Sequence, residues 1–399
     1  MVPGVSIPDL SGLRPTRAEI SLDALEANLA AVRARVGDLP VLGVVKANGY
    51  GHGAVPVARA LLSGTGIDSL AVALLEEAEE LRRHGIATPL LVMGALEPEQ
   101  MEAVIRLGVT PALFREDQLT ALDEAAGRQG RPHPFHLKVD TGTGRLGVPW
   151  RRMAGFLDHL SRRPRLILEG VFSHLACADD PGHPLTALQI ERFEEALALI
   201  RSRGFSPSLR HLANSAAILD RPPAWMNLVR PGLLLYGYRP SPRNQSLSLT
   251  PALRFSSRIV FLKELPPGDS VGYGATFLAK RSSRIATVAA GYDDGVLRSL
   301  SNRGHFLVRG RRVPIVGRVS MDLTTLDVTD FPDVALGDEA VLIGGQEGAF
   351  QGADQVAAEA DTISWDLLCG IGGRVPRIYL RGGRVVEVRS RFLDGRDLP

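Results

Sequence analysis

Apolar runs and amphipathic stretches alternate along the first 237 residues of the chain. Eight runs, each almost without interruption by polar residues, predict parallel strands that are buried on both faces. They are VLGVVKA (41–47), DSLAVA (68–73), PLLVMG (89–94), VTPALF (109–114), FHLKVD (135–140), LILEGVFSHL (166–175), LRHLAN (209–214) and LVRPGLLLYG (228–237). The stretches between them, such as LLEEAEELRRHG (74–85), have helical spacing and end in glycine. A further helix is predicted at 22–36, with Ser21 as its cap. Eight such units favour a (β/α)8 barrel, of the TIM type, over an open doubly wound sheet.

After residue 250 the pattern changes. Short segments such as RIATVAAGY, HFLVRG and RIYLRGGRVVEV are separated by turn residues, and helical spacing is weak except around 351–369. This pattern predicts a mainly antiparallel β domain. Because 399 residues exceed what one hydrophobic core usually organises, we expect two domains, the barrel over 1–250 and the β domain over 251–399.

Composition excludes several classes of function. The 46 Lys and Arg residues and 44 Asp and Glu residues leave a net charge of +2 without a basic block, which argues against a nucleic-acid partner. The start of the chain lacks the pattern of a secretory signal, and no apolar run approaches the roughly 18 residues needed to cross a bilayer. Two cysteines, Cys177 and Cys369, are too few for a disulfide framework. We therefore expect a cytoplasmic protein with no membrane partner.

Polar residues fall at the carboxyl ends of the predicted barrel strands. Lys46, Asp140, His174 and Asn214 each close a strand, and Arg230 lies within the eighth. In a barrel these ends meet on the face where active sites are built. A lysine at the end of a buried strand loses solvation, which lowers its pKa and frees its amine for Schiff-base chemistry.

Two further segments suggest a phosphorylated ligand. KANGYGHG (46–53) contains three glycines that allow backbone to approach a ligand closely. HLANSAA (211–217) joins the seventh strand to a helix, and barrels commonly bind phosphate after strands seven and eight, where Ser215 and Gly232 lie. A reactive lysine together with a phosphate site suggests a cofactor that carries an aldehyde and a phosphate, which pyridoxal phosphate does.

Two other interpretations were weighed. GTGRLG (142–147) matches a dinucleotide-binding fingerprint, but it follows the fifth strand rather than the first and carries Arg145 in its interior. HLACADDPGH (174–183) contains possible metal ligands, but their spacing matches no standard zinc pattern. A polar loop over an active site, with His174 pointing inward, explains this second segment better.

In order and spacing, several fragments together resemble the alanine racemase family over about residues 16 to 381. The fragments are VVKANGYGHG, KVDTGTGRLG, HLANSAA, RPGLLLYG, VGYGATF, AAGYDDG, GRVSMD and RVPRIYLR. The resemblance implies a fold-type III pyridoxal-phosphate barrel followed by a β domain, in a homodimer with shared active sites. It also implies interconversion of L-alanine and D-alanine, which supplies D-alanine for peptidoglycan.

The resemblance assigns roles to individual residues. Lys46 would hold the cofactor and act as one base, and Tyr273 of the other subunit would be the second base. Arg145, positioned by a Lys138 that is carbamylated in many relatives, and the backbone N–H of Met321 would bind the substrate carboxylate. The residues implied to surround the cofactor are Tyr50, His174, Asn214, Ser215, Arg230, Gly232, Leu233 and Trp365. Those implied to line the substrate entrance are Asp179, Tyr292, Arg298, Arg318 and Asp322.

These roles agree with the chemistry of racemisation. A proton must leave one face of the α-carbon and return to the other, so two bases on opposite faces are needed. Arg230 would face the pyridine nitrogen, and because arginine keeps its proton, that nitrogen should stay unprotonated. The ring is then a weaker electron sink, which limits transamination.

Three positions depart from the family pattern. Trp365 stands where relatives usually carry a tyrosine whose hydroxyl reaches the phosphate, Thr143 replaces a common methionine, and Asp293 replaces the usual alanine. An altered pocket at Trp365 leaves open a racemase for serine or for a broader set of amino acids. A pyridoxal-phosphate carrier without catalysis is disfavoured because such relatives lack the β domain, and a barrel decarboxylase should not carry this set of motifs.

Overall fold

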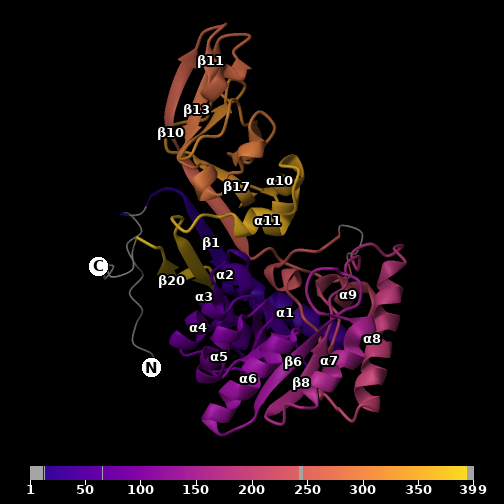
Figure 1. Cartoon of the computed structure of the whole chain (residues 1–399). Coiled ribbons are helices and arrows are strands. Elements are labelled where there is room, and N and C mark those ends of the chain that lie inside the picture. Colours follow the sequence, from indigo (N-terminus) through magenta and orange to yellow (C-terminus); the bar gives the residue numbers. More distant parts are fainter. Residues whose placement is uncertain (1–11, 13, 65, 242–245, 393–399) are drawn as a thin grey trace. The chain divides into compact units, whose positions relative to one another are not determined.

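The computed structural model describes residues 12, 14–64, 66–241 and 246–392, which fall into two compact units. The barrel unit comprises Leu25–Gly49 and Ala54–Thr250. The β unit comprises Met1–Ala24, Tyr50–Gly53 and Pro251–Pro399. Figure 1 labels the elements of both units. None of the helices in the described part of the chain has the length and apolar character needed to span a bilayer.

The barrel unit is built on a curled parallel sheet with the strand order β2-β3-β4-β5-β6-β8-β9, with the short β7 paired to β6. The strands are β2 (Leu42–Val44), β3 (Ser69–Val72), β4 (Leu90–Val92), β5 (Thr110–Leu113), β6 (His133–Asp140), β7 (Val148–Pro149), β8 (Leu166–Phe172) and β9 (Leu209–His211). Most of their residues are buried, as the continuous apolar runs predict. The parallel order and the helix that follows each strand confirm the predicted barrel class.

The segment around Val229 closes the barrel. Leu42 N–H donates to the Val229 carbonyl over 2.9 Å, and Val44 N–H donates to the Pro231 carbonyl over 3.0 Å. On the other side, Arg230 N–H donates to the Ala213 carbonyl over 3.1 Å, next to β9. The prediction of a strand as far as residue 237 was wrong, because η5 (Leu233–Tyr236) is a 3-10 helix. A short apolar run does not distinguish these two conformations.

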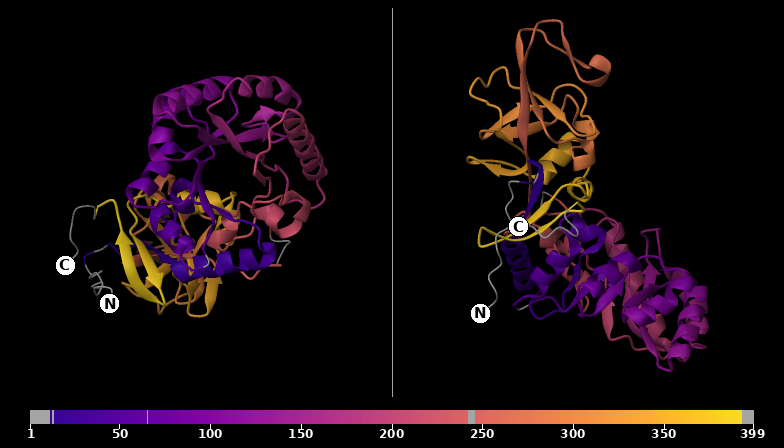
Figure 2. Two further views of the ribbon diagram at one scale, coloured as in Figure 1. Left: turned by 90° about the horizontal axis from the view of Figure 1, so that it is seen from below. Right: turned by 90° about the vertical axis from the view of Figure 1, so that its left-hand side faces the viewer.

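Helices flank the strands of the barrel unit, as the view in the left panel of Figure 2 shows. They are α1 (Leu22–Val36), α3 (Ala54–Leu62), α4 (Leu75–Arg83), α5 (Met101–Leu107), α6 (Glu116–Gln129), α7 (Met153–Leu160), α8 (Leu185–Ser202) and α9 (Ser215–Asp220), with short turns α2 (Lys46–Tyr50), η2 (Pro98–Gln100), η3 (Trp150–Arg152) and η4 (Pro222–Ala224). The helix predicted at 22–36 is confirmed as α1. Its Ser21 cap is also confirmed, because Ser21 Oγ accepts the Ala24 N–H over 3.1 Å.

The β unit contains a sheet with the main order β15-β14-β17-β10-β1-β19-β20. Its strands are β1 (Arg17–Ser21), β10 (Leu253–Leu265), β11 (Ser270–Val271), β12 (Phe277–Leu278), β13 (Ser283–Val288), β14 (His305–Val308), β15 (Arg311–Pro314), β16 (Thr324–Asp327), β17 (Glu339–Gln346), β18 (Ala349–Gln351), β19 (Arg377–Arg381) and β20 (Arg384–Arg389). Its helices are α10 (Ala353–Glu359) and α11 (Ser364–Cys369), with short turns η6 (Tyr273–Ala275), η7 (Tyr292–Asp294) and η8 (Arg298–Leu300). The pairs are antiparallel except β1 with β19, so the mainly antiparallel prediction is confirmed.

The N-terminal strand β1 belongs to this second sheet. It pairs antiparallel with β10 and parallel with β19, and its Ala18 and Ile20 are fully buried. The predicted barrel, over residues 1–250, included strand β1. The pairing joins positions more than 230 residues apart, which local periodicity does not indicate.

Candidate active site

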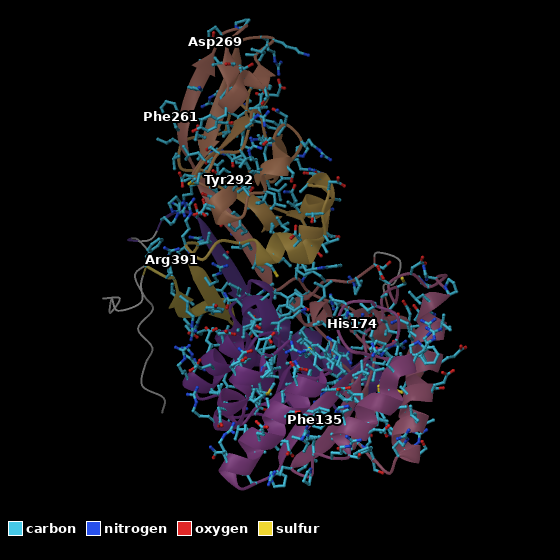
Figure 3. The ribbon with its side chains drawn as sticks, in the orientation of Figure 1. Phe135, His174, Phe261, Asp269, Tyr292 and Arg391 are labelled. Atoms are coloured by element: carbon cyan, nitrogen blue, oxygen red, sulfur yellow. The ribbon has the colours of Figure 1, made fainter. Side chains whose placement is uncertain are left out.

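Basic side chains gather at the carboxyl ends of the barrel strands. They are Lys46, Lys138, Arg145, His174 and Arg230, and Figure 3 labels His174 among them. Burial, and then the charges of the four other residues, lower the pKa of His174 to about 3. Burial and the same neighbouring charges lower the pKa of Lys138 to about 8, against the opposing effect of Asp140. Positive charge therefore predominates here, which suits an anionic ligand.

Arg230 is held in a fixed position inside the barrel. Its guanidinium donates to the carbonyls of His211 (2.7 Å), Ser173 (2.8 Å) and Leu212 (3.2 Å). It also lies over the Phe172 ring, 5.4 Å from the centroid. Burial lowers the pKa of Arg230 to about 9, which still leaves it protonated at neutral pH.

Glu77 fixes the backbone beside Lys46, which lies two residues beyond β2. Its carboxylate accepts the N–H of Ala47 over 2.5 Å. It also accepts the N–H groups of Ala73 (2.8 Å) and Leu74 (3.1 Å), just after β3. Glu77 thus ties the ends of two neighbouring strands together and positions the lysine.

The backbone after Lys46 is left-handed over four residues. The φ angles of Ala47, Asn48, Gly49 and Tyr50 are 52°, 51°, 59° and 51°. Three of these residues carry a side chain, and such residues adopt this conformation at a cost of roughly 1–2 kcal/mol each. Asn48 Oδ1 offsets part of it by accepting the Ala54 N–H over 2.9 Å. The conformation is therefore imposed by the surrounding structure.

The loop after β8 carries His174 and is held by two side chains. Thr143 Oγ1 and Gln189 Nε2 both donate to the His174 carbonyl, and the buried Gln189 also accepts the Ala176 N–H over 2.8 Å. Thr143 is one of the departures from the family pattern. Methionine cannot donate this hydrogen bond, so the threonine adds a contact that orders the loop.

The two alternative motifs do not form the sites that were weighed for them. Asp140 Oδ1 accepts the N–H groups of Gly142 (2.9 Å) and Gly144 (3.1 Å), and the GTGRLG loop leads into β7 rather than into a helix. A dinucleotide loop would open a helix. Over the described residues, no group of three or more His, Cys, Asp or Glu side chains is placed to hold a metal ion. Asp179 is exposed on the loop that follows His174.

The residues predicted to hold a phosphate come together after β9 and after the closing strand segment. Asn214 caps α9 by accepting the Ala217 N–H over 3.1 Å. The buried Ser215 Oγ accepts the N–H groups of Gly232 (2.9 Å) and Leu234 (3.4 Å), which flank Leu233. The Ser215 hydroxyl thus joins the start of α9 to the segment that contains Leu233.

In the β unit, Trp365 lies on α11 and Tyr50 lies near the end of this helix. Burial together with Cys369, the last residue of the helix, raises the pKa of Tyr50. A Cβ at Gly51 would lie 2.1 Å from the Leu368 carbonyl oxygen. Residues 50–53 therefore pack directly on α11.

Gly51 and Gly53 approach the protein rather than a ligand. Gly53 has a φ of 96°, and a Cβ there would lie 1.9 Å from the Tyr379 hydroxyl. That hydroxyl donates to the His52 carbonyl over 3.0 Å. The interpretation of these glycines as ligand-facing is corrected by these contacts, because each gives room for packing on α11 or β19.

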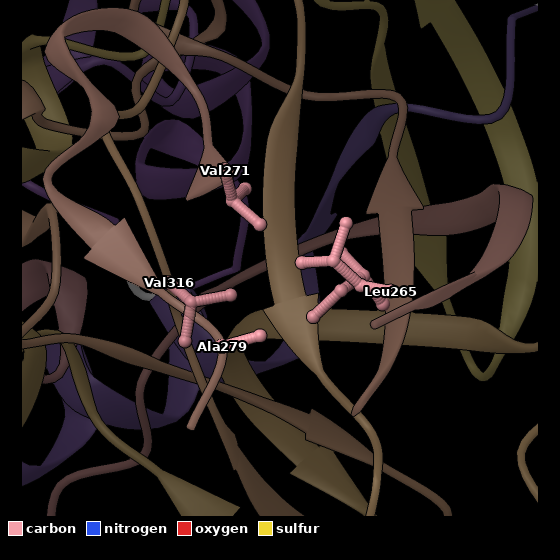
Figure 4. Close-up of a cluster of buried hydrophobic side chains, with 5 residues drawn as sticks. Leu265, Val271, Ala279 and Val316 are labelled. Atoms are coloured by element: carbon pink, nitrogen blue, oxygen red, sulfur yellow. The ribbon is translucent and has the colours of Figure 1, made fainter. Parts of the chain in front are cut away.

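Tyr273 lies at the tip of the hairpin β11–β12 and is 73% exposed. Figure 4 shows the buried cluster beneath this hairpin, formed by Leu265, Val271, Ala279, Ile285 and Val316. Two cluster members, at 271 and 279, flank the tip. Apolar packing therefore fixes the base of the hairpin while its tyrosine extends into solvent.

Neighbouring loops of the β unit carry the other residues assigned to the substrate entrance. Tyr292 N–H donates to the Ser320 carbonyl over 2.9 Å, next to Met321, which is 51% exposed. Asn302, just beyond the exposed Arg298, donates to Thr276 near the hairpin tip over 3.1 Å. A Cβ at Gly272 would lie 3.1 Å from the backbone nitrogen of Arg318. The loops at Asn302 and Arg318 thus contact the hairpin directly.

Arg374 organises the same loops. It bonds Asp322 (2.7 Å) and the carbonyl of Met321 (3.1 Å), and it pairs with Asp293 (2.9 Å) and the fully buried Asp294 (2.7 Å). Asp293 is another departure from the family pattern. Its carboxylate shares Arg374 with those of Asp294 and Asp322.

Sequence reasoning missed Glu77, Gln189 and Arg374, whose partners are known only from the fold. The small number of lysines is a signal that could have narrowed the candidates for a reactive amine. Of the 46 Lys and Arg residues only four are lysines, at 46, 138, 263 and 280. Lys263 and Lys280 are exposed in the β unit, whereas Lys46 and Lys138 lie in the barrel site. Two of the four lysines thus lie where burial can lower the pKa of an amine.

Comparison with known proteins supports one family over nearly the whole chain. Residues 20–240 match the model of the alanine racemase N-terminal domain, and residues 252–379 match that of its C-terminal domain. The alanine racemase of Symbiobacterium thermophilum is 47% identical over 373 residues, which span 93% of this chain and 98% of the relative. Alanine racemase 2 of Caldanaerobacter subterraneus subsp. tengcongensis is 44% identical over 95% of this chain and 98% of the relative.

Solved structures agree with the sequence comparison. The alanine racemase of Bacillus anthracis with bound L-Ala-P superposes with a TM-score of 0.90 at 37% identity, covering 96% of this chain and 99% of the other. The alanine racemase of the D-cycloserine producer Streptomyces lavendulae superposes with a TM-score of 0.88 at 38% identity, covering 92% and 98%.

Proposed function

The chain belongs to the alanine racemase family, and we propose that it interconverts L-alanine and D-alanine with pyridoxal phosphate as its cofactor, supplying D-alanine for peptidoglycan in the cytoplasm. The observation that carries the proposal is the group of basic side chains at the carboxyl ends of the barrel strands, with Lys46 among them. In this proposal the barrel unit binds the cofactor, and the β unit contributes to the partner's site.

The residues present fit an anionic pyridine cofactor. Lys46, Lys138 and Arg230 place positive charge in a half-buried or buried site, where an anion lowers their mutual repulsion. Asn214, Ser215, Gly232 and Leu233 lie together and would hold the phosphate. The family resemblance also assigns Tyr50 and Trp365 to the phosphate. When bound, the cofactor supplies a covalent link to an amine and an electron sink next to the α-carbon.

Proton transfer is carried out by two residues of the chain. The Lys46 Nζ atom takes the α-proton from D-alanine on one face, and the Tyr273 hydroxyl, from the other subunit, takes it from L-alanine on the opposite face. A free tyrosine titrates near pH 10. The cations around Arg145 and Lys138 favour its phenolate when it enters the site.

Other residues hold the substrate and tune the ring. Arg145 and the Met321 backbone N–H bind the carboxylate, and Lys138 positions Arg145. Arg230, held by three carbonyls, would face the pyridine nitrogen, and because the guanidinium keeps its proton it would leave that nitrogen unprotonated. His174 lies beside it and stays neutral, because its pKa is about 3. Asp179, Tyr292, Arg298, Arg318 and Asp322 line the entrance.

A homodimer with shared sites explains the exposure of these loops. Tyr273, Tyr292 and Met321 are 73%, 41% and 51% exposed, and such large side chains at neighbouring loops mark a surface that a partner covers. Activity should therefore fall when the protein is diluted below the dimer dissociation constant. A monomer with full activity would contradict the shared site.

The direct test is conversion of L-alanine to D-alanine by purified protein with added pyridoxal phosphate. The holoenzyme should show a visible absorption band that borohydride abolishes, and Lys46→Ala should lack both the band and activity. Lys280→Ala, which changes an exposed lysine of the β unit, is the matched control. After borohydride, mass spectrometry should locate the added group on Lys46 among the four lysines. A label on another lysine contradicts the assignment.

The two-base assignment is tested by proton exchange in deuterium oxide. Tyr273→Phe should retain exchange at the α-carbon of D-alanine, because Lys46 serves that face, and should lose exchange from L-alanine. Each enantiomer is the control for the other within one variant. Equal exchange from both would remove Tyr273 from the mechanism.

Trp365 supports a second candidate, a racemase for serine or for a broader set of amino acids. Its indole N–H donates a hydrogen bond but cannot accept one, and its bulk differs from that of tyrosine. Measuring kcat/KM for alanine, serine and larger amino acids, with wild type and Trp365→Tyr, decides between the candidates.

A further inference from the structure

A chain of hydrogen bonds inside the barrel leads from Arg230 to a carboxylate. Arg230 donates to His211 Nδ1 over 3.0 Å, His211 Nε2 lies 2.8 Å from His136 Nδ1, and His136 Nε2 lies 3.3 Å from Glu169. The arginine and both histidines are at most 4% exposed, whereas the Glu169 side chain is 38% exposed. All four residues belong to the barrel unit.

The direction of every hydrogen bond in this chain follows from the arginine. A guanidinium can only donate, so His211 Nδ1 must accept and its proton must be on Nε2. That N–H donates to His136, whose Nδ1 must therefore accept, which leaves the proton of His136 on Nε2 facing the carboxylate of Glu169. Both rings are neutral, and both have the same tautomer.

The backbone is shaped to allow these contacts. Phe135 pairs with Leu168 and His136 pairs with Gly170, so Glu169 is one extra residue in β8, a β-bulge. Bulges redirect a side chain, and they are common next to active sites. A Cβ at Gly170 would lie 2.6 Å from the His136 ring, so only glycine leaves room for the imidazole there.

The rings are also held from the side. His211 stacks on Phe172 with ring centroids 4.8 Å apart and an angle of 4° between the planes. His136 meets His211 edge to face at 4.9 Å. On β6 (His133–Asp140), His136 precedes Lys138, so the chain of hydrogen bonds leads from the site toward the start of the strand. These contacts fix the rings in the geometry that the hydrogen bonds need.

We propose that Glu169, acting through His136 and His211, is a positioning residue that holds the Arg230 guanidinium in place and keeps it charged. A carboxylate at the end of the chain polarises each imidazole in turn, which makes His211 Nδ1 a stronger acceptor. The inference rests on the proposed function, in which Arg230 faces the pyridine nitrogen. It extends the control of that nitrogen to a residue that touches neither cofactor nor substrate.

The test separates the charge of Glu169 from its ability to accept. Glu169→Gln keeps an acceptor oxygen but removes the charge, and Glu169→Ala removes both. Glu195→Gln, an exposed glutamate on α8, is the matched control. Because Glu169 is partly exposed, these variants should fold. Protein labelled with 15N-histidine reports the tautomer of the nine histidines by NMR.

In wild type and Glu169→Gln, His136 and His211 should both be protonated on Nε2 alone. In Glu169→Ala the tautomers should stay the same because Arg230 still sets them, but the His136 Nε2–H loses its acceptor and its 15N chemical shift should change. With cofactor and alanine, kcat should fall about threefold in Glu169→Gln and about tenfold in Glu169→Ala, with KM unchanged within about twofold. A different tautomer in wild type, or an unchanged His136 Nε2 shift and an unchanged kcat in Glu169→Ala, would overturn the proposal. The NMR measurement does not require racemase activity. If the protein does not racemise alanine, the state of the histidines still tests the hydrogen-bond chain.

Discussion

Lys138 places a positive charge in a buried site that already holds other cations, and we expect Lys138→Met to stabilise the protein. The side chain is 7% exposed, and its pKa falls from 10.5 to about 8. Each pKa unit corresponds to about 1.4 kcal/mol, so the charge lowers the free energy of unfolding by up to about 3 kcal/mol. Methionine has a similar length and no charge, so it removes this cost and keeps the packing.

The effect should depend on pH in a defined way. Below pH 8 both the folded and the unfolded lysine are protonated, so the full cost of burying the charge is present. Between pH 8 and 10.5 the folded form is already neutral, and the cost decreases as pH rises. The advantage of Lys138→Met should therefore be largest at pH 7 and should fall to about 1 kcal/mol at pH 10.

Urea unfolding of the cofactor-free protein measures this advantage. We expect a higher urea midpoint for Lys138→Met than for wild type at pH 7, and a much smaller difference between the two midpoints at pH 10. Lys280→Met changes an exposed lysine and should shift the free energy of unfolding by less than about 0.5 kcal/mol at either pH. A Lys138→Met variant that is less stable at pH 7, or equally stabilised at both pH values, would refute the reasoning.

Three further predictions concern stability. Thr143→Val should lose the hydrogen bond to the loop after β8 and about 1 kcal/mol in urea unfolding, and an unchanged midpoint would show that this bond contributes nothing. Gly53→Ala should lower the melting temperature much more than Gly85→Ala, because both glycines have positive φ but only at Gly53 would the new Cβ collide with a tyrosine hydroxyl. His174 and His211 have pKa values below 6.5, so the folded state binds fewer protons than the unfolded chain. Stability should fall below pH 6.5 by about 1.4 kcal/mol per pH unit for each histidine, and a flat profile between pH 6.5 and 5 would contradict this assignment.

Local patterns predicted the elements that local forces decide. The apolar spacing and the Ser21 cap located α1, and the continuous apolar runs located the barrel strands. The run at 228–237 extended too far because LLLYG fits a strand or a 3-10 helix equally well, and Pro231 has no N–H to continue a ladder. The pairing of β1 with β10 and β19 depends on distant sequence and had no local signal.

In the candidate site, too, local sequence predicted some features, while contacts between distant residues could not be predicted. The sequence alone predicted that Lys46, His174 and Arg230 lie close together, because a barrel gathers the carboxyl ends of its strands on one face. The contact of His136 with His211 joins positions 75 residues apart, and it depends on a register shift that no periodicity reveals. The scarcity of lysine is visible in the sequence and reduces the candidates for a reactive amine to four positions without any knowledge of the fold.

The four residues Tyr50–Gly53 belong to the β unit, although residues on both sides of them belong to the barrel unit. The chain therefore changes unit four times between its ends, and no single cut yields two complete modules. A chimera that takes its barrel from one relative and its β unit from another must transfer this short loop together with α11 and β19. Recombination at residue 250 alone would pack Gly51 and Gly53 from one relative against α11 and β19 from the other.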